Sequence, residues 1–400
     1  MGKRQALNNG WTLRESKYFN QLLVNMSDMA NPPSICFISI PAYGYFQPEE
    51  ANPGGSRQFY LLAHTLADSF DVHFIVGDYG QAKTEYIDGV TLQRTYKPEK
   101  RSGPLDQSRK LATLFRTIQR VDADIYIYCG YPHKTAVTSL ILDLLRKRQV
   151  YQIVADHNLG RDFNAAGLHW QYLFERSLSR VDRIVAQTEV QADRLRSKFD
   201  QKAVRIPIGY EPVDDFISYE ERNGFVWIGN INQTNKAPHR YLDAAERLQS
   251  EEFTLVGPPD DDEEYVSTIR QRAASLSNVE YHGPVPSTEI HEYFRDRYAL
   301  VNTSPAEGFP NTFLEAWRYG TPVVSLNVDP GRYVAFDRES GGADGDFDQF
   351  VSLLGSVATD IDFRSSLGEQ AKATFLERYR LSIVSERYES LLREVLAEIR

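Results

Sequence analysis

The chain has 400 residues, of which 42% are hydrophobic, 25% charged and 12% aromatic, and its formal net charge is −10. This length favours two domains of about 200 residues each, because a single hydrophobic core seldom serves so long a chain. The composition excludes a mostly disordered, collagen-like or coiled-coil protein, and an acidic balance without a basic run argues against nucleic acid as a partner.

The amino-terminal thirty residues are too polar for a secretory signal, and no window approaches the ~20 apolar residues of a membrane span. We therefore expect a cytoplasmic protein. The two cysteines, Cys36 and Cys129, fit small buried hydrophobes better than a disulfide or a metal pair. Basic and acidic residues number 27 and 24 in residues 1–215, but 18 and 31 in residues 216–400. The first half is therefore the part that could approach an anionic lipid surface.

From residue 34 onwards, short β-branched runs alternate with longer amphipathic segments. We expect six buried parallel strands, over residues 35–40, 71–77, 124–129, 150–155, 182–187 and 203–209. We expect helices between them, over 56–69, 133–148, 168–180 and 189–199. Strand and helix in alternation are typical of a doubly wound, Rossmann-like α/β domain.

The stretch 210–224 interrupts this alternation with Pro212 and several acidic side chains, as expected of an exposed linker. The alternation then restarts, with strands expected over 225–229, 253–257, 279–283, 299–304 and 322–326. The corresponding helices are expected over 237–249, 264–275, 288–295 and 312–319. From Asp346 onwards the pattern is helical.

The predicted fold class is therefore α/β, with two Rossmann-like doubly wound domains and a helical carboxy-terminal segment. The expected boundaries are a polar extension over 1–33, a first domain over 34–209, the linker over 210–224, a second domain over 225–379 and a carboxy-terminal helix over 380–400. A return of this last helix to the first domain is one option left open.

The loop after the run 299–304 carries the most informative motif, EGFPNTFLEAWRYGTPVVS. Ligands of open parallel sheets bind beyond the carboxyl ends of the strands. Gly308 lets the backbone approach a ligand closely, and the amides of residues 308–312 open a predicted helix, whose dipole favours an anion such as a diphosphate. Glu307 and Glu315 flank this position at roughly 10–15 Å from each other. That is about the distance between the sugar and the ribose of a nucleotide sugar, whose paired hydroxyls donate to carboxylates.

This motif resembles the Glu-x7-Glu signature of the retaining glycosyltransferases of family 4. The resemblance implies the GT-B architecture, in which two Rossmann-like domains, an acceptor-side domain and a donor-binding domain, face a cleft. It also implies that Glu307 holds hydroxyls of the donor sugar and Glu315 holds the ribose. The residues that it assigns to the diphosphate lie between these two: Gly308, Phe309, Pro310, Asn311 and Thr312.

The resemblance assigns further residues to the donor site. Lys236 fits the family's diphosphate-binding lysine, whereas Asn230 stands where the family has an arginine, so that one cation is missing. In the first domain, Gly54 and Gly55 match the family's glycine-rich loop beside the donor phosphates, and Gly54 is also assigned to the acceptor side.

Two histidines follow expected strands of the first domain. His157 matches the family's histidine near the donor sugar and completes the expected catalytic set with Glu307 and Lys236; a capped loop histidine is the alternative. His133 is assigned to the acceptor side, although the family's histidine in that region lies closer to the strand, where this chain has Cys129. The identity of a catalytic base stays open. The sequence shows no metal-binding motif, and no cofactor is expected.

The expected function is a retaining, metal-independent transfer of a sugar from a nucleoside diphosphate sugar to a hydroxyl of a glycan, a lipid-linked acceptor or a small molecule. UDP is the first expectation for the nucleotide and GDP the second. The alternatives are a sugar-nucleotide epimerase of the same fold and a catalytically weak subunit that binds nucleotide sugar. Contact with the inner face of a membrane would be peripheral and through the first domain, and the oligomeric state is left open.

Overall fold

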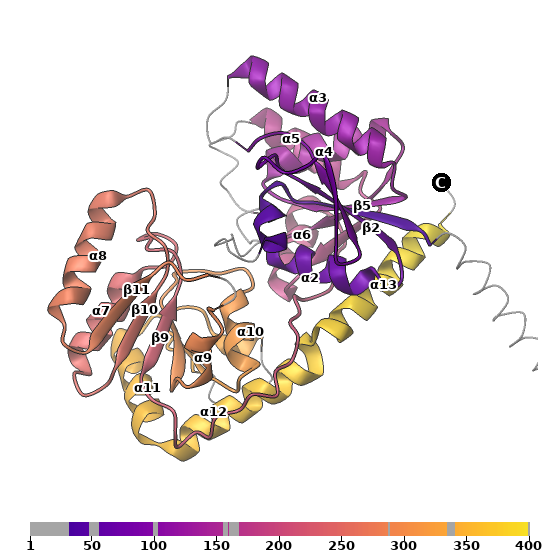
Figure 1. Cartoon of the computed structure of the whole chain (residues 1–400). Coiled ribbons are helices and arrows are strands. Elements are labelled where there is room, and N and C mark those ends of the chain that lie inside the picture. Colours follow the sequence, from indigo (N-terminus) through magenta and orange to yellow (C-terminus); the bar gives the residue numbers. More distant parts are fainter. Residues whose placement is uncertain are drawn as a thin grey trace, which may run out of the picture.

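The computed structural model describes residues 32–47, 56–98, 103–154, 159, 168–286, 289–333 and 341–398. It consists of two domains, each built on its own sheet, and the chain crosses between them twice (Figure 1).

The first domain contains an eight-stranded sheet in the order β3-β4-β2-β1-β5-β6-β7-β8, in which β3 alone is antiparallel to its neighbour. Its strands are β1 (Ser34–Ile38), β2 (Asp71–Val76), β3 (Thr84–Ile87), β4 (Val90–Arg94), β5 (Ile125–Cys129), β6 (Arg148–Gln152), β7 (Arg183–Ala186) and β8 (Val204–Arg205). Its helices are α2 (Arg57–Leu66), α3 (Pro104–Val121), α4 (Pro132–Leu144), α5 (Leu168–Leu178) and α6 (Glu189–Phe199), with a short 3-10 helix at Ile40–Phe46.

Alternate residues of the central strand β1 enter two separate cores, because successive side chains of a strand point to opposite faces of its sheet. Ile35 and Phe37 pack with α2 and with the last helix, α13 (Leu381–Ala397). Cys36 and Ile38 pack on the other face, against the side covered by α3, α4, α5 and α6. Both faces are therefore buried, which explains why the strands are hydrophobic throughout.

The second domain contains a five-stranded sheet in the order β11-β10-β9-β12-β13, in which each strand is parallel to its neighbours. Its strands are β9 (Phe225–Ile228), β10 (Phe253–Val256), β11 (Val279–Gly283), β12 (Ala299–Asn302) and β13 (Val323–Ser325). Its helices are α7 (Pro238–Arg247), α8 (Glu263–Ser275), α9 (Glu292–Arg295), α10 (Asn311–Trp317), α11 (Phe347–Thr359) and α12 (Ile361–Thr374). The strand order reverses between β9 and β12, which is where open sheets of this kind bind ligands.

The two crossings between the domains are hydrogen-bonded to each other. The Tyr210 amide donates to the Tyr379 carbonyl at 3.0 Å, and the Leu381 amide donates to the Tyr210 carbonyl at 2.9 Å. Beyond this point α13 runs along the first domain (Figure 1). There the Tyr388 hydroxyl donates to the Gln152 side chain of β6 at 2.8 Å. The last helix thus packs on the domain that the chain builds first.

The expected fold class, two doubly wound α/β domains with a helical carboxy-terminal region, is confirmed. The strand expected over 203–209 is shorter, since only β8 pairs in the sheet and the Gly209 amide already donates to the Gln58 side chain. Among the described elements of the first domain, α3, the antiparallel pair β3 and β4, and the 3-10 helix over Ile40–Phe46 were not expected. In the described part of the chain, no helix combines the length and apolar character needed to cross a bilayer.

Candidate donor-binding site

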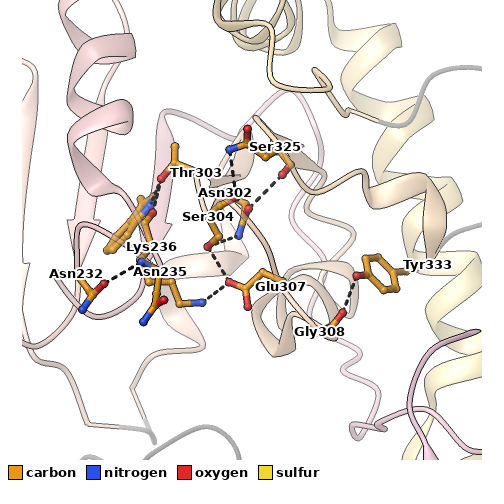
Figure 2. A network of polar contacts seen from close by, with 12 residues as sticks. Asn232, Asn235, Lys236, Asn302, Thr303, Ser304, Glu307, Gly308, Ser325 and Tyr333 are labelled. Atoms are coloured by element: carbon orange, nitrogen blue, oxygen red, sulfur yellow. Dashed lines mark hydrogen bonds and ion pairs between the residues drawn. The ribbon is translucent and has the colours of Figure 1, made fainter. Parts of the chain in front are cut away.

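The loops that follow β9 and β12 bring two of the predicted residues into contact. Lys236 lies in the loop between β9 and α7, and Glu307 in the loop between β12 and α10. The Lys236 ammonium donates to Oε1 of Glu307, as Figure 2 shows. The Lys236 side chain is 33% exposed and the Glu307 side chain 17% exposed, so a ligand can still reach both. A cation and a carboxylate therefore share the edge of the sheet at its switch point.

A chain of hydrogen bonds fastens the two loops to each other (Figure 2). The Ser304 hydroxyl donates to Oε1 of Glu307 at 2.7 Å. The Thr303 hydroxyl donates to the Lys236 carbonyl at 2.8 Å and accepts from the Trp227 indole at 2.9 Å. Because Trp227, Thr303 and Ser304 are buried, these contacts fix the backbone that carries the charged pair.

The loop before Lys236 is held by Asn232. Its carbonyl accepts the amides of Lys236 and Ala237 at 3.2 and 2.8 Å, and its side-chain oxygen accepts the amides of Thr234 and Asn235. The turn places Ala237 in the left-handed region, with φ 48°. Non-glycine residues rarely adopt this conformation, and it is common at functional sites.

The segment between the two glutamates packs against aromatic rings. The Phe309 ring is buried, with its centroid 4.8 Å from that of Tyr333 and 5.4 Å from that of Tyr379. The Tyr333 hydroxyl donates to the Gly308 carbonyl at 2.7 Å (Figure 2). This packing sets the course of the loop from Glu307 into α10.

Within the same segment, Pro310 is also buried, while Asn311 and Thr312 are half-buried. α10 has only seven residues. The expected helix over 312–319 is therefore shorter at its carboxyl end than the sequence suggested.

Glu315 lies in α10 and is only 8% exposed. Its carboxylate accepts a hydrogen bond from Arg57, the first residue of α2 in the other domain. The Arg57 guanidinium also lies over the Tyr210 ring, 4.9 Å from its centroid. Burial lowers the pKa of Arg57, but the interactions with Glu315, Tyr210 and Tyr45 raise it by more. The net pKa lies above its ordinary value, so the guanidinium stays charged. For Tyr210, burial has the opposite effect: it raises the pKa and keeps the hydroxyl neutral.

Other predicted residues lie apart from this charged cluster. The Asn230 side chain is exposed, and the Asn230 carbonyl accepts the Asn232 amide at 2.7 Å. His133 is the second residue of α4 in the first domain, where its ring stacks on Tyr131 and meets Trp170 edge-on. Burial and the neighbouring Lys134 lower the pKa of His133, which favours the neutral ring.

His157, Gly54 and Gly55 lie outside the described residues. Among the residues that the structure describes, no group of three His, Cys, Asp or Glu side chains is arranged to hold a metal ion.

Several residues of the cluster were not singled out from the sequence as donor-site residues: Tyr210, Trp227, Thr303 and Ser304. Arg57 and Glu315 are 258 residues apart, and no local pattern links them. Ser304 carries a weak signal, because a hydroxyl three residues before a carboxylate can reach it within a turn.

Comparison with protein families identifies both halves of the chain. Residues 53–215 match the model described as Glycosyltransferase Family 4, and residues 222–360 match the model described as Glycosyl transferases group 1. The loops with Lys236, Glu307 and Glu315 all lie in the second match. The lipopolysaccharide core biosynthesis glycosyltransferase LpsE of Rhizobium meliloti (strain 1021) is 30% identical over 95 residues. That alignment spans 23% of this chain and 28% of the relative.

Solved structures share the whole architecture. A sucrose-phosphate synthase from Thermosynechococcus elongatus superposes with a TM-score of 0.73 at 15% identity, over 91% of this chain and 99% of that one. Anabaena HepE, in complex with UDP and glucose, superposes with a TM-score of 0.70 at 14% identity, over 90% and 100% of the two chains. At such identities the likeness shows the fold, which is the two-domain GT-B arrangement.

Proposed function

Because the chain is a glycosyltransferase of the GT-B type, with a family 4 domain followed by a group 1 domain, we propose that it is a retaining enzyme that uses a UDP-sugar. The sugar passes to a hydroxyl of a carbohydrate or lipid-linked acceptor. The observation that carries the proposal is the contact of Lys236 with Glu307 at the switch point of the second sheet. UDP is preferred over GDP because a structural neighbour, HepE, holds UDP and glucose.

In this proposal the two carboxylates bind opposite ends of the donor. Glu307, half-buried and held by Ser304, accepts hydrogen bonds from hydroxyls of the sugar. Glu315, buried in α10, accepts hydrogen bonds from hydroxyls of the ribose. The two glutamates are eight residues apart in sequence, so the diphosphate lies between them, within reach of Lys236.

Lys236 supplies the charge that the departing diphosphate needs. The bond between the anomeric carbon and the phosphate oxygen breaks, and the electron pair leaves with the diphosphate, whose charge the ammonium stabilises. The acceptor oxygen bonds to the anomeric carbon on the face that the diphosphate leaves, and a phosphate oxygen takes the acceptor proton. An enzyme nucleophile and a divalent metal ion are then not required.

The proposal is tested by following donor turnover with the purified full-length chain. We expect UDP to raise the melting temperature more than GDP does, since a ligand at 100 times its Kd stabilises a protein by about 2.7 kcal/mol. Proton NMR of the product should show the anomeric configuration of the donor, and EDTA should leave the rate unchanged. An inverted product, or a rate abolished by EDTA and restored by Mg²⁺ or Mn²⁺, would contradict the retaining, metal-independent mechanism.

Substitutions separate the roles of the two partners. Lys236→Gln should lower kcat by roughly 10²–10³-fold, the usual cost of removing one group that stabilises developing charge. Glu307→Gln should change the preference among UDP-sugars more than the affinity for UDP itself. Lys202→Gln and Glu211→Gln, at exposed positions, are the matched controls and should behave as the unsubstituted chain.

A further inference from the structure

Helices α4 and α5 carry large apolar side chains that remain on the surface of the first domain. Leu140 is 47% exposed and Leu144 69% on α4, and Tyr172 is 59% exposed and Leu173 41% on α5. The two helices pack side by side over the same core, on the side of the sheet away from α13 (Figure 1). The four residues therefore form one surface, here termed the α4–α5 face. Isolated exposed leucines are ordinary, whereas a group of them marks a contact surface.

A groove of about 120 Å³ runs between the two helices and opens onto this face. Its walls include Val137 and Leu140 from α4 and Leu173 from α5, while Arg176 of α5 and Arg180, just after α5, also line it. The lining is thus apolar with cationic groups beside it. This is the combination of a surface that contacts acyl chains and head groups together.

The charges next to the face are unequal. Arg146 is exposed just after α4, and Arg176 is exposed on α5, where one guanidinium nitrogen donates to the Tyr172 hydroxyl at 3.2 Å. The acidic neighbours are Asp143, which is ion-paired with Arg180 at 2.8 Å, and Glu175, which accepts from Gln171. Within the described part of the chain, Arg146 and Arg176 form no ion pair with an acidic side chain, and both accompany the apolar side chains in a protein whose net charge is −10.

We propose that the α4–α5 face docks the protein on the surface of an anionic lipid bilayer. The leucines and Tyr172 enter the interfacial layer, and Arg146 and Arg176 meet the lipid phosphates. A second copy of the chain is the competing occupant. A two-fold dimer would bring the arginines of both copies into one interface, where like charges repel, so the charge pattern favours lipid.

The test is sedimentation of the full chain with vesicles of phosphatidylcholine alone and with added phosphatidylglycerol. We expect binding to the phosphatidylglycerol vesicles only, and release at about 0.5 M salt, where screening shortens the range of the charge interaction. The double variant Leu140→Ser/Leu144→Ser should lose at least about tenfold in partition coefficient. Arg176→Glu should lose binding, whereas Arg176→Lys should retain it.

The control variant is Tyr86→Ser on β3, which removes a side chain that is 75% exposed at the far edge of the same sheet. It should bind vesicles as the unsubstituted chain does, and all variants should keep the melting temperature and the affinity for UDP. The proposal is overturned if the unsubstituted chain does not bind phosphatidylglycerol vesicles, or if Leu140→Ser/Leu144→Ser binds equally well. Light scattering that shows a dimer dissociated by the same double variant would assign the face to a second copy instead.

Discussion

The Arg57 guanidinium, at the start of α2 in the first domain, donates a hydrogen bond to the Glu315 carboxylate in α10 of the second. The same guanidinium lies over Tyr210, where the chain first crosses between the domains. One side chain therefore contacts the first crossing and the carboxylate that we assign to the ribose. A nucleotide sugar whose ribose hydroxyls donate hydrogen bonds to Glu315 must share this carboxylate with Arg57.

The first prediction concerns this pair. Glu315→Ala should weaken UDP binding by roughly 1–3 kcal/mol, because ribose hydroxyls lose their partner in a desolvated site. Arg57→Ala should add little to that loss in the double variant, since residues in direct contact are not additive. Calorimetry with UDP measures all three variants. Arg183→Ala, which breaks the ion pair with Glu398 away from the site, is the control. Unchanged UDP affinity in Glu315→Ala would refute the ribose assignment.

The second prediction concerns the missing cation at position 230. The exposed Asn230 side chain lies on the loop that carries Lys236, so Asn230→Arg adds a guanidinium that can reach the diphosphate. UDP binding should tighten by roughly 1–3 kcal/mol, while turnover need not rise because a tighter product leaves more slowly.

Arg240 and Arg57 are the two arginines that could supply, from another position, the cation that is missing at Asn230. Arg240 is ion-paired with Asp243 and lies near the Phe347 ring, whereas Arg57 contacts Glu315. We therefore expect Arg57→Ala to weaken UDP binding and Arg240→Ala to leave it unchanged. A large loss in Arg240→Ala, with no gain in Asn230→Arg, would show that Arg240 already neutralises the diphosphate.

The third prediction uses the backbone next to Lys236. Ala237 has φ 48° and ψ 52°, a conformation that costs an L-residue about 1–2 kcal/mol and glycine much less. Ala237→Gly should therefore stabilise the chain by roughly 0.5–1 kcal/mol in urea unfolding. Ala192→Gly, inside α6, should instead destabilise it by about 1 kcal/mol. Destabilisation by both substitutions would show that the turn at Ala237 is not strained.

The fourth prediction is a pH dependence. Burial lowers the pKa of His239, against the opposing influence of Asp243, and the ring contacts the Tyr265 hydroxyl at 2.8 Å. The unfolded chain therefore binds this proton at a higher pH than the folded chain does. Stability should fall as the pH drops below about 6.5, the ordinary histidine value. Urea unfolding at neutral and mildly acidic pH should show a smaller fall in His239→Gln, and an NMR titration that places the His239 pKa at or above 6.5 would exclude this contribution.

The sequence predicted the parallel strands well, because strands that are buried on both faces consist of nearly continuous runs of apolar residues. It also placed Lys236 and Glu307 after expected strands of the second domain, where ligands of open parallel sheets bind, but it did not show that these two strands are neighbours. The hairpin of β3 and β4 was missed although Asp88 and Gly89, both with positive φ, form a recognisable turn pair. β3 is half-exposed and lacks the apolar signal on which the assignment relied, whereas β4 is mostly buried but alternates apolar with polar residues.

The contact of Arg57 with Glu315 could not be predicted in the same way. It depends on how the two domains meet, and neither periodicity nor motif spacing carries that information. The same holds for Tyr210, which looked like an ordinary linker residue yet is 2% exposed beneath the Arg57 guanidinium. Contacts between residues of the two domains depend on the relative placement of the domains, which the sequence pattern does not give.

The packing of α13 on the first domain has a practical consequence for building chimaeras. Val384, Tyr388 and Leu392 are buried in the same core as Phe59 and Leu62 of α2. A gene fragment that ends after residue 209 therefore encodes a sheet with one face stripped of a covering helix. Grafting a new first domain onto this second domain should succeed only when residues 34–209 and 381–398 are exchanged together, from the same parent.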